Sequence, residues 1–186
     1  MIGRETGTRR WLLWCKAWAN PSVLERRKGE ASLLRDLAQA DELVICNRFG
    51  EDIEQIVSLA KQIDDTGRLH SIGLDPFGIG AVIDALADEG ISGDDKVLGI
   101  TQGWKLSGAI KTTERKLADG TLRHGGQSLM SWCVGNARVE PKGNAIVITK
   151  QASGSAKIDP LMATFNAVAL MSANPRSAPS YQMVIL

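Results

Sequence analysis

The stretch HSIGLDPFGIGAVIDALADEGI, residues 70–91, decides the fold class of this chain. A short apolar strand at residues 69–74 leads into Asp75, and residues 78–87 follow with apolar side chains three and four positions apart, the spacing of an amphipathic helix. Residues 97–100 form a second short strand after that helix. Two strands joined by one helix predict parallel pairing through a crossover connection.

The same alternation of elements continues toward both ends of the chain. A turn at residues 4–7 precedes an aromatic-rich strand, and a glycine- and serine-containing stretch at residues 151–156 precedes a final apolar helix. We therefore expect a mixed α/β sheet flanked by helices, with an antiparallel hairpin at the start. The remaining expected elements are a strand at 11–18, a partly helical segment at 20–42, a short apolar run at 43–46, a helix at 51–63, a helix at 106–117, a strand at 145–149 and a helix from about 159 to 173.

Composition places the chain among globular proteins. With 186 residues, 44% of them apolar and 23% charged, it is long enough for one domain with a sizeable hydrophobic core. Its first residues lack the pattern of a signal peptide, and the sequence contains no run of about 18 apolar residues. Cys15, Cys46 and Cys133 are far apart and odd in number, so we expect three buried thiols in a reducing, cytosolic environment.

The net charge is only +1, but the charges are unevenly distributed. Residues 30–95 carry 15 acidic and 4 basic side chains, a balance of −11, whereas residues 96–157 carry 10 basic and 3 acidic side chains, a balance of +7. Such asymmetry is typical of a protein that turns one face toward a polyanion and holds carboxylates near metal ions. Two ordinary solvated surfaces would produce the same counts, and charge alone favours that simpler interpretation.

The sequence gives no support to several kinds of active site. It contains no glycine-rich loop followed by Lys-Ser or Lys-Thr, which nucleotide hydrolysis would require, and no serine-centred nucleophile elbow. His70 and His124 have no cysteine or glutamate at metal-ligand spacing. We therefore expect both histidines to be structural or surface residues.

Two aspartates at the ends of elements are the candidates for chemistry. Asp75 follows a buried-type strand, where open α/β sheets form their sites, and a carboxylate is the kind of oxygen ligand that Mg²⁺ requires. A turn cap before Pro76 explains Asp75 at least as well. Asp159 stands before a proline at the start of a helix, where it could cap the helix or bind a metal ion. Lys150 and Lys157 lie on either side of the preceding loop, a placement suited to phosphate contacts.

Four phrases taken together resemble the nuclease domain of phage terminase large subunits. Their order gives a strand ending in aspartate, Gln-Gly before a Leu-Ser helix start, Trp-x-x-x-Asn, and a Lys-Ile-Asp helix start. The resemblance covers roughly residues 2–173. The phrases are residues 70–91, quoted above, VLGITQGWKLSGAIKTTERKLADGTLRHGG at 97–126, LMSWCVGNARVEPKGNAIVITKQ at 129–151 and KIDPLMATFNAVALM at 157–171.

The resemblance implies an RNase H-like sheet and a two-metal endonuclease that cuts concatemeric double-stranded phage DNA during genome packaging. Three acidic residues would hold two Mg²⁺ or Mn²⁺ ions about 3.5–4 Å apart, one activating water and the other stabilising the leaving 3′ oxygen. Asp75 matches the family's second acid and Asp159 its third, which makes both of them candidate catalytic and metal-binding residues. Asn136 matches the asparagine of Trp-x-x-x-Asn, to which we assign no role.

The family's first acid lies on a strand that would precede residues 1–10. Glu5 is the only acid before Trp11, and its turn position does not fit. The sequence therefore predicts an N-terminally truncated nuclease domain at residues 1–174, without the ATPase motor and with the first strand missing, followed by a tail at 175–186. With two acids we expect poor metal affinity, a largely missing second ion and little or no cleavage, and we expect an added upstream strand with its acid to restore cutting.

Two alternative functions remain open. One is a non-catalytic prophage remnant that binds DNA or a packaging partner through its basic half, and the other is a different RNase H-like nuclease such as a junction resolvase.

The resemblance implies double-stranded DNA, the terminase small subunit and the portal as partners, no membrane, and a place in the cytoplasm of the bacterial host. We expect the isolated fragment to be a monomer or to associate weakly. The candidate phosphate contacts are Lys105, Lys111, Arg115, Lys116, Arg123, Lys150 and Lys157.

Overall fold

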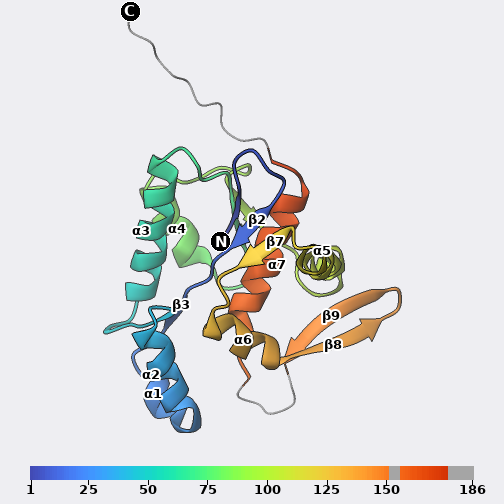
Figure 1. Ribbon diagram of the computed structural model, residues 1–186. Helices are drawn as coiled ribbons and strands as arrows, with labels where there is room; N and C mark the ends of the chain where they lie inside the picture. Colours follow the sequence, from blue (N-terminus) through green and yellow to red (C-terminus); the bar gives the residue numbers. More distant parts are fainter. Residues whose placement is uncertain (151–155, 176–186) are drawn as a thin grey trace, which may run out of the picture.

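The computed structural model describes residues 1–150 and 156–175, and these form the expected mixed α/β arrangement. The predicted loop at 151–156 and the predicted tail at 175–186 lie outside the described residues, except for Ala156 and Pro175. In Figure 1, a long C-terminal helix runs through the middle of the molecule, with the N-terminal strands in front of it and two helices to its left. None of the described helices has the length and apolarity that crossing a membrane would take.

The first strands form a three-stranded sheet. β1 (Ile2–Arg4) pairs antiparallel with β2 (Trp11–Leu13), which confirms the predicted hairpin, and β7 (Leu122–His124) pairs parallel with β2. Glu5 closes the turn of the hairpin. Its Oε2 accepts hydrogen bonds from Thr8 Oγ1 at 2.8 Å and from Arg10 Nε at 2.6 Å, so the carboxylate is engaged within the turn.

The strand predicted at residues 11–18 is interrupted after its first three residues. β3 (Ala17–Ala19) resumes the extended path and pairs parallel with β4 (Leu43–Ile45). Between β2 and β3, the side chain of Gln127 pairs with the backbone of Cys15: its Oε1 accepts from the Cys15 N–H at 2.8 Å, and its Nε2 donates to the Cys15 carbonyl at 2.7 Å. A side-chain amide here takes the place of a neighbouring strand, and no pattern within residues 11–18 could have revealed it.

The crossover predicted from residues 70–91 is confirmed. β5 (Ile72–Leu74) pairs parallel with β6 (Val97–Gly99), and α4 (Gly80–Asp88) connects the two strands. α3 (Glu51–Asp65) links β4 to β5 and packs beside α4, as Figure 1 shows on the left of the molecule. Among the described strands, β6 is the only hydrogen-bonded neighbour of β5.

The other helices and strands surround this framework. β8 and β9 pair antiparallel and form a hairpin that stands to one side of the molecule (Figure 1). The remaining elements are α1 (Val23–Arg26), η1 (Lys28–Glu30), α2 (Ala31–Gln39), η2 (Gly103–Leu106), α5 (Ser107–Ala118), α6 (Ser128–Gly135), β8 (Ala137–Lys142), β9 (Ala145–Lys150) and α7 (Asp159–Ser172).

β7, α6 and β8 are among the observed elements that had no counterpart among the predictions. β7 is only three residues long, so it offers too few positions for an alternating pattern. α6 lacks the one-sided apolar stripe of a surface helix, because apolar and small residues follow one another along most of its length. β8 contains Pro141, a residue that argues against a strand except at an edge, and β8 has β9 as its only strand partner among the described residues.

The packing of the molecule is centred on α7. Val168 of this helix is completely buried, and Phe165 and Leu161 belong to the same hydrophobic cluster as Trp11 and Cys133. The three cysteines are buried and unpaired, as predicted. A smaller cluster of Val57, Leu86 and Ile91 lies between α3 and α4.

The approach of α7 to β5 depends on a glycine. A Cβ atom added at Gly73 would lie 2.9 Å from Leu170 Cδ1 and 2.9 Å from Ile100 Cγ1. Both distances are shorter than van der Waals contact, so the Leu170 and Ile100 side chains would have to shift to accommodate a side chain at this position. The Ile-Gly-Leu sequence of β5 therefore sets how closely α7 can pack.

We expect Gly73→Ala to lower the free energy of unfolding by about 1–3 kcal/mol, because the added methyl overpacks this contact. Urea denaturation followed by circular dichroism measures the change. Gly108→Ala is the matched control, since a Cβ there meets nothing within 4 Å. We expect the control to stay within about 1 kcal/mol of the wild type. Equal stability of the two variants would contradict the packing described for α7.

Candidate functional site

Asp75 follows β5 directly, at the end of the strand where the turn toward α4 begins. Its side chain is exposed, and its Oδ1 accepts a hydrogen bond from the Phe77 N–H at 3.2 Å. The predicted turn-capping role is therefore present. This bond uses one carboxylate oxygen, and the structure gives the other oxygen no hydrogen bond within the described residues, so the carboxylate can still offer a ligand atom to a cation.

Asp159 is the first residue of α7, so of its two interpretations from the sequence, helix cap or metal ligand, the structure does not show the cap. Ile158 occupies the N-cap position and Asp159 already belongs to the helix, followed by a proline. The Asp159 side chain is 67% exposed, and its nearest basic partner is Lys157, with Nζ 3.8 Å from Oδ2. A carboxylate that does not cap its helix and remains exposed is available for a ligand.

Asn136 fixes the backbone just before α7. It follows α6, and its Nδ2 donates a 3.0 Å hydrogen bond to the Lys157 carbonyl. Cys133, one turn earlier on α6, is completely buried, and burial raises the pKa of its thiol to about 12, with the negative charge of nearby Asp159 adding to the rise. The asparagine of Trp-x-x-x-Asn therefore has a structural contact that the sequence did not reveal: it holds the residues that lead into Asp159.

Asp75 and Asp159 lie toward the same end of the β5–α7 pair. Leu170 of α7 lies against Gly73, and Asn166, one turn closer to the start of α7, accepts a 3.0 Å hydrogen bond from Gln102, which follows β6. α7 therefore runs antiparallel to β5, so that the direction from Gly73 to Asp75 along the strand is the direction from Leu170 to Asp159 along the helix. The remaining seven residues from Asn166 to Asp159 span about 10 Å along the helix axis.

The acidic side chains in the described residues do not form a ready-made metal cluster. No group of three or more His, Cys, Asp or Glu side chains within residues 1–150 and 156–175 is arranged to hold a metal ion. His70 and His124 are exposed, as expected for surface residues. Asp75 and Asp159 are thus the carboxylates that the sequence singled out, without a third acidic side chain gathered beside them in the described part of the chain.

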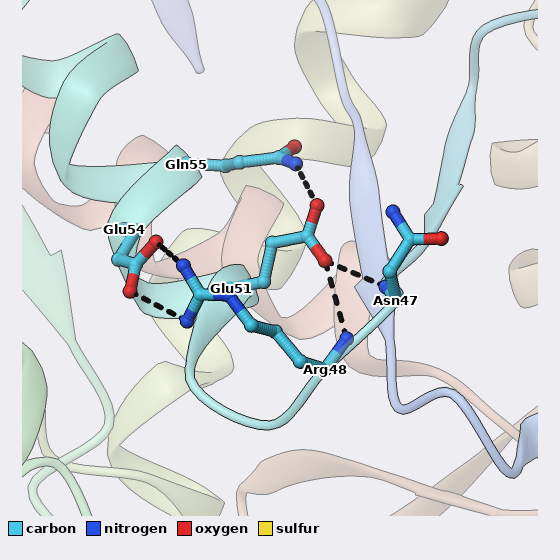
Figure 2. A network of polar contacts seen from close by, with 5 residues as sticks. All are labelled: Asn47, Arg48, Glu51, Glu54 and Gln55. Carbon is cyan, nitrogen blue, oxygen red and sulfur yellow. Dashed lines mark hydrogen bonds and ion pairs between the residues drawn. The ribbon is translucent and has the colours of Figure 1, made fainter.

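The acids at the start of α3 are engaged in a structural network, which Figure 2 shows from close by. Glu51 Oε2 accepts from the backbone N–H groups of Asn47, at 2.6 Å, and Arg48, and its Oε1 accepts from Gln55 Nε2 at 2.9 Å. The Asn47 and Arg48 N–H groups hold the pKa of Glu51 below its ordinary value. Arg48 binds both oxygens of Glu54 and likewise lowers the pKa of that carboxyl group.

This network connects α3 to the sheet. Trp18 of β3 donates from Nε1 to Gln55 Oε1 at 2.9 Å, so Gln55 binds both the strand and Glu51. The carboxylates of Glu51 and Glu54 therefore hold the loop after β4 in place. Their contacts account for them without a metal ion.

The predicted phosphate contacts are divided among several surfaces. Lys105 lines an open cleft together with Trp104 and Lys142. Arg115 and Lys116 line a second cleft near the end of α7, together with Arg4 and Arg9. This second cleft lies about 20 Å from Asp159 along the axis of α7. The others are Lys111, exposed on α5, Arg123, exposed on β7, Lys150, exposed at the end of β9, and Lys157, which is paired with Asp159.

The sequence-based predictions included Lys105, Arg115 and Lys116 but missed other residues of these clefts, among them Trp104, Lys142, Arg4 and Arg9. Lys116 is held by Trp11, with its Nζ 4.2 Å from the ring centroid, and Arg4 donates to Asn174 Oδ1 at 2.9 Å, so both of these cations also have structural partners. The two adjacent arginines, Arg9 and Arg10, could have indicated a basic surface at the second cleft from the sequence alone. Trp104 gave no such signal for the first cleft, because the sequence does not show that its ring is exposed.

We expect Asn136→Ala to lower the free energy of unfolding by about 0.5–1.5 kcal/mol, because it removes the hydrogen bond to the Lys157 carbonyl. Urea denaturation measures the loss. Gln62→Ala, which removes an exposed amide on α3, is the control and should stay within about 0.5 kcal/mol of the wild type. A stability unchanged by Asn136→Ala would show that this bond does not hold the start of α7.

Comparisons with known proteins agree with the observed fold. A profile of the family described as "Terminase large subunit, endonuclease domain" matches residues 24–174. The crystal structure of the HK97 bacteriophage large terminase matches with a TM-score of 0.71 and 20% sequence identity, over 91% of this chain and 35% of that chain. Protein YmfN of Escherichia coli (strain K12) is 28% identical over 119 residues, which are 63% of this chain and 26% of that protein. The chain thus spans about a third or less of the length of these relatives.

Proposed function

Because this chain belongs to the family of terminase large subunit endonuclease domains, we propose that it provides a divalent-cation-dependent DNA endonuclease site for phage genome packaging. The observation that supports the site most directly is the placement of two exposed carboxylates, Asp75 and Asp159, toward the same end of β5 and α7. The RNase H-like fold of the HK97 relative supports the architecture. The proposed substrate is concatemeric double-stranded phage DNA.

The donor atoms of the proposed site fit a hard cation. Carboxylate oxygens are the ligands that Mg²⁺ and Mn²⁺ take in proteins, and Asp159 remains available because it does not cap its helix. Asp75 and Asp159 would hold the ion, which would supply Lewis-acid activation of water and of the scissile phosphate. Two carboxylates provide fewer charges than a two-ion site requires, so we propose that this chain binds metal ions weakly and that the second ion is largely missing.

The chain's own residues have distinct roles in this proposal. Asp75 and Asp159 would supply the carboxylate oxygens that hold the cation. Lys157, whose Nζ is 3.8 Å from Asp159 Oδ2, would pair with a DNA phosphate. Asn136 holds the Lys157 backbone in place and thereby positions both side chains.

We expect Mn²⁺ to bind the wild-type chain, and Asp75→Asn and Asp159→Asn each to weaken its binding at least tenfold, since each variant removes one charged ligand. Isothermal titration measures the affinity. Asp88→Asn, in the last turn of α4, is the matched control and should leave the affinity unchanged.

Under protein excess we expect slow Mn²⁺-dependent nicking of plasmid DNA that both site variants abolish. Fast nicking that survives Asp75→Asn would contradict the assignment.

A second candidate function has one observation in its favour. The absence of a third acidic side chain beside Asp75 and Asp159, within the described residues, is what a non-catalytic protein that binds DNA or a packaging partner would show. Such a protein would bind DNA with no response of the complex to Asp75→Asn and no nicking in Mn²⁺. The family match favours a terminase over a junction resolvase.

We expect binding of double-stranded DNA to weaken steeply with salt. Each phosphate contact contributes about 0.9 to the slope of log K against log salt, because it releases condensed counterions. Replacing Lys111 and Arg115, both exposed on α5, with alanine should therefore reduce the slope by about 1.8 if both contact phosphates. Lys28→Ala, an exposed lysine of η1, is the control. An affinity that stays flat with salt in the wild type would contradict a DNA-binding face.

The proposed partners follow from the family rather than from a surface of the chain. The terminase small subunit and the portal are the proteins with which the larger packaging protein would assemble, in the cytoplasm of the bacterial host. We propose that the isolated chain is a monomer. Sedimentation of the 186-residue chain alone tests this directly.

A further inference from the structure

Trp104 is an exposed aromatic ring at the end of the sheet that also carries Asp75. Its side chain belongs to η2, which follows β6, and the residue is 56% exposed although its ring is large and mostly apolar. β6 is the parallel neighbour of β5, and Gln102, two residues before Trp104, binds Asn166 of α7. The ring therefore lies on the side of the molecule to which the proposed cation site also belongs.

The ring lines an open cleft whose two walls are held together. One wall is η2 with the start of α5, and the other is the turn of the β8–β9 hairpin. Ser107 joins them, because its Oγ accepts a 3.1 Å hydrogen bond from the Ile146 N–H. Gly108 and Ala145, both small, also line the cleft, so there is room for a flat group beside the indole. The cleft is thus formed before any ligand binds.

The charges around the ring favour an anionic aromatic ligand. Lys105 places its Nζ 5.8 Å from the centroid of the Trp104 ring, and Lys142 stands on the hairpin wall. Both lysines are exposed, and the described residues that line the cleft include no acidic side chain. An exposed aromatic ring with one lysine over it and a second lysine in the same cleft matches one nucleotide, with its base on the ring and its flanking phosphates near the lysines.

We propose that this cleft binds an unpaired nucleotide of a DNA strand, with the base stacked on Trp104 and the adjacent phosphates paired with Lys105 and Lys142. In an intact duplex the faces of each base are covered by its neighbours, so the ligand is a base that has left the stack. The proposal rests on the proposed function for the identity of the ligand as DNA, and it deepens that function. The strand would be opened beside the cut, and Trp104 would hold the opened nucleotide.

The test is a binding measurement without divalent metal, which separates it from cleavage. Fluorescence anisotropy of a labelled 12-nucleotide oligothymidine in EDTA reports the affinity of the full chain for single-stranded DNA, and a blunt duplex of the same length serves for comparison. We expect Trp104→Ala to weaken single-strand binding about tenfold, the effect of losing one stacked base. Trp104→Phe should retain most of the affinity, because it keeps an aromatic face.

Two further readouts distinguish stacking from a structural role of Trp104. A strand of abasic sites should bind the wild type and Trp104→Ala equally well, because it has no base to stack. Lys105→Ala and Lys142→Ala should each lower the salt slope for the single strand by about 0.7, whereas Lys28→Ala should not. Unchanged circular dichroism spectra check that the variants are folded.

Each outcome decides one of the two proposals. Loss of single-strand affinity in Trp104→Ala, with the abasic strand unaffected, supports the stacking site even if no plasmid nicking is found. Equal single-strand affinity of the wild type and Trp104→Ala overturns it, even if Mn²⁺-dependent nicking is present. A loss confined to the blunt duplex overturns it as well, because the cleft would then be a groove contact. If the chain binds neither nucleic acid, both the stacking site and the proposed DNA endonuclease site are overturned, and the exposed ring would instead contact a protein partner.

Discussion

The contact between α7 and β5 is the constraint on which the remaining structure depends. A glycine in the middle of a three-residue strand allows Leu170 to lie directly against the backbone, and the helix then carries Val168 and Phe165 into the main core. Because α7 is fixed at this point, its N-terminal half runs in the direction in which β5 leads to Asp75. The proposed cation site follows from this packing rather than from a separate loop.

Side-chain amides hold much of the rest in place. Gln127 replaces a strand beside Cys15, Asn136 binds the backbone before α7, Gln102 joins the end of β6 to Asn166, and Gln55 joins β3 to α3. Each of these amides connects segments far apart in the sequence. In a fold whose strands are mostly three residues long, they supply hydrogen bonds that longer strands would exchange with each other.

The sequence predicted the parts of the fold that rest on local periodicity. The crossover at residues 70–91 and the long helices have apolar spacing that reveals them, and their bounds fall within a few residues of those observed. The break in the first strand, the helix α6 and the positioning role of Asn136 depend on contacts between distant residues, which no local pattern records. Asp159 shows the same limit: an aspartate before a proline predicts an N-cap, but the preceding Ile158 takes that position. The candidate site could be named from the resemblance, whereas the exposed ring of Trp104 became informative only beside the hairpin.

The central claim is that Asp75 and Asp159 share one divalent cation. Diffraction from crystals of the chain soaked in Mn²⁺, with data collected for the anomalous signal of manganese, tests this most directly. The account predicts an anomalous peak within coordination distance of a carboxylate oxygen from each aspartate, about 2.1–2.3 Å. A peak bound by other residues, or the two carboxylates on opposite sides of α7 with no peak between them, would contradict it.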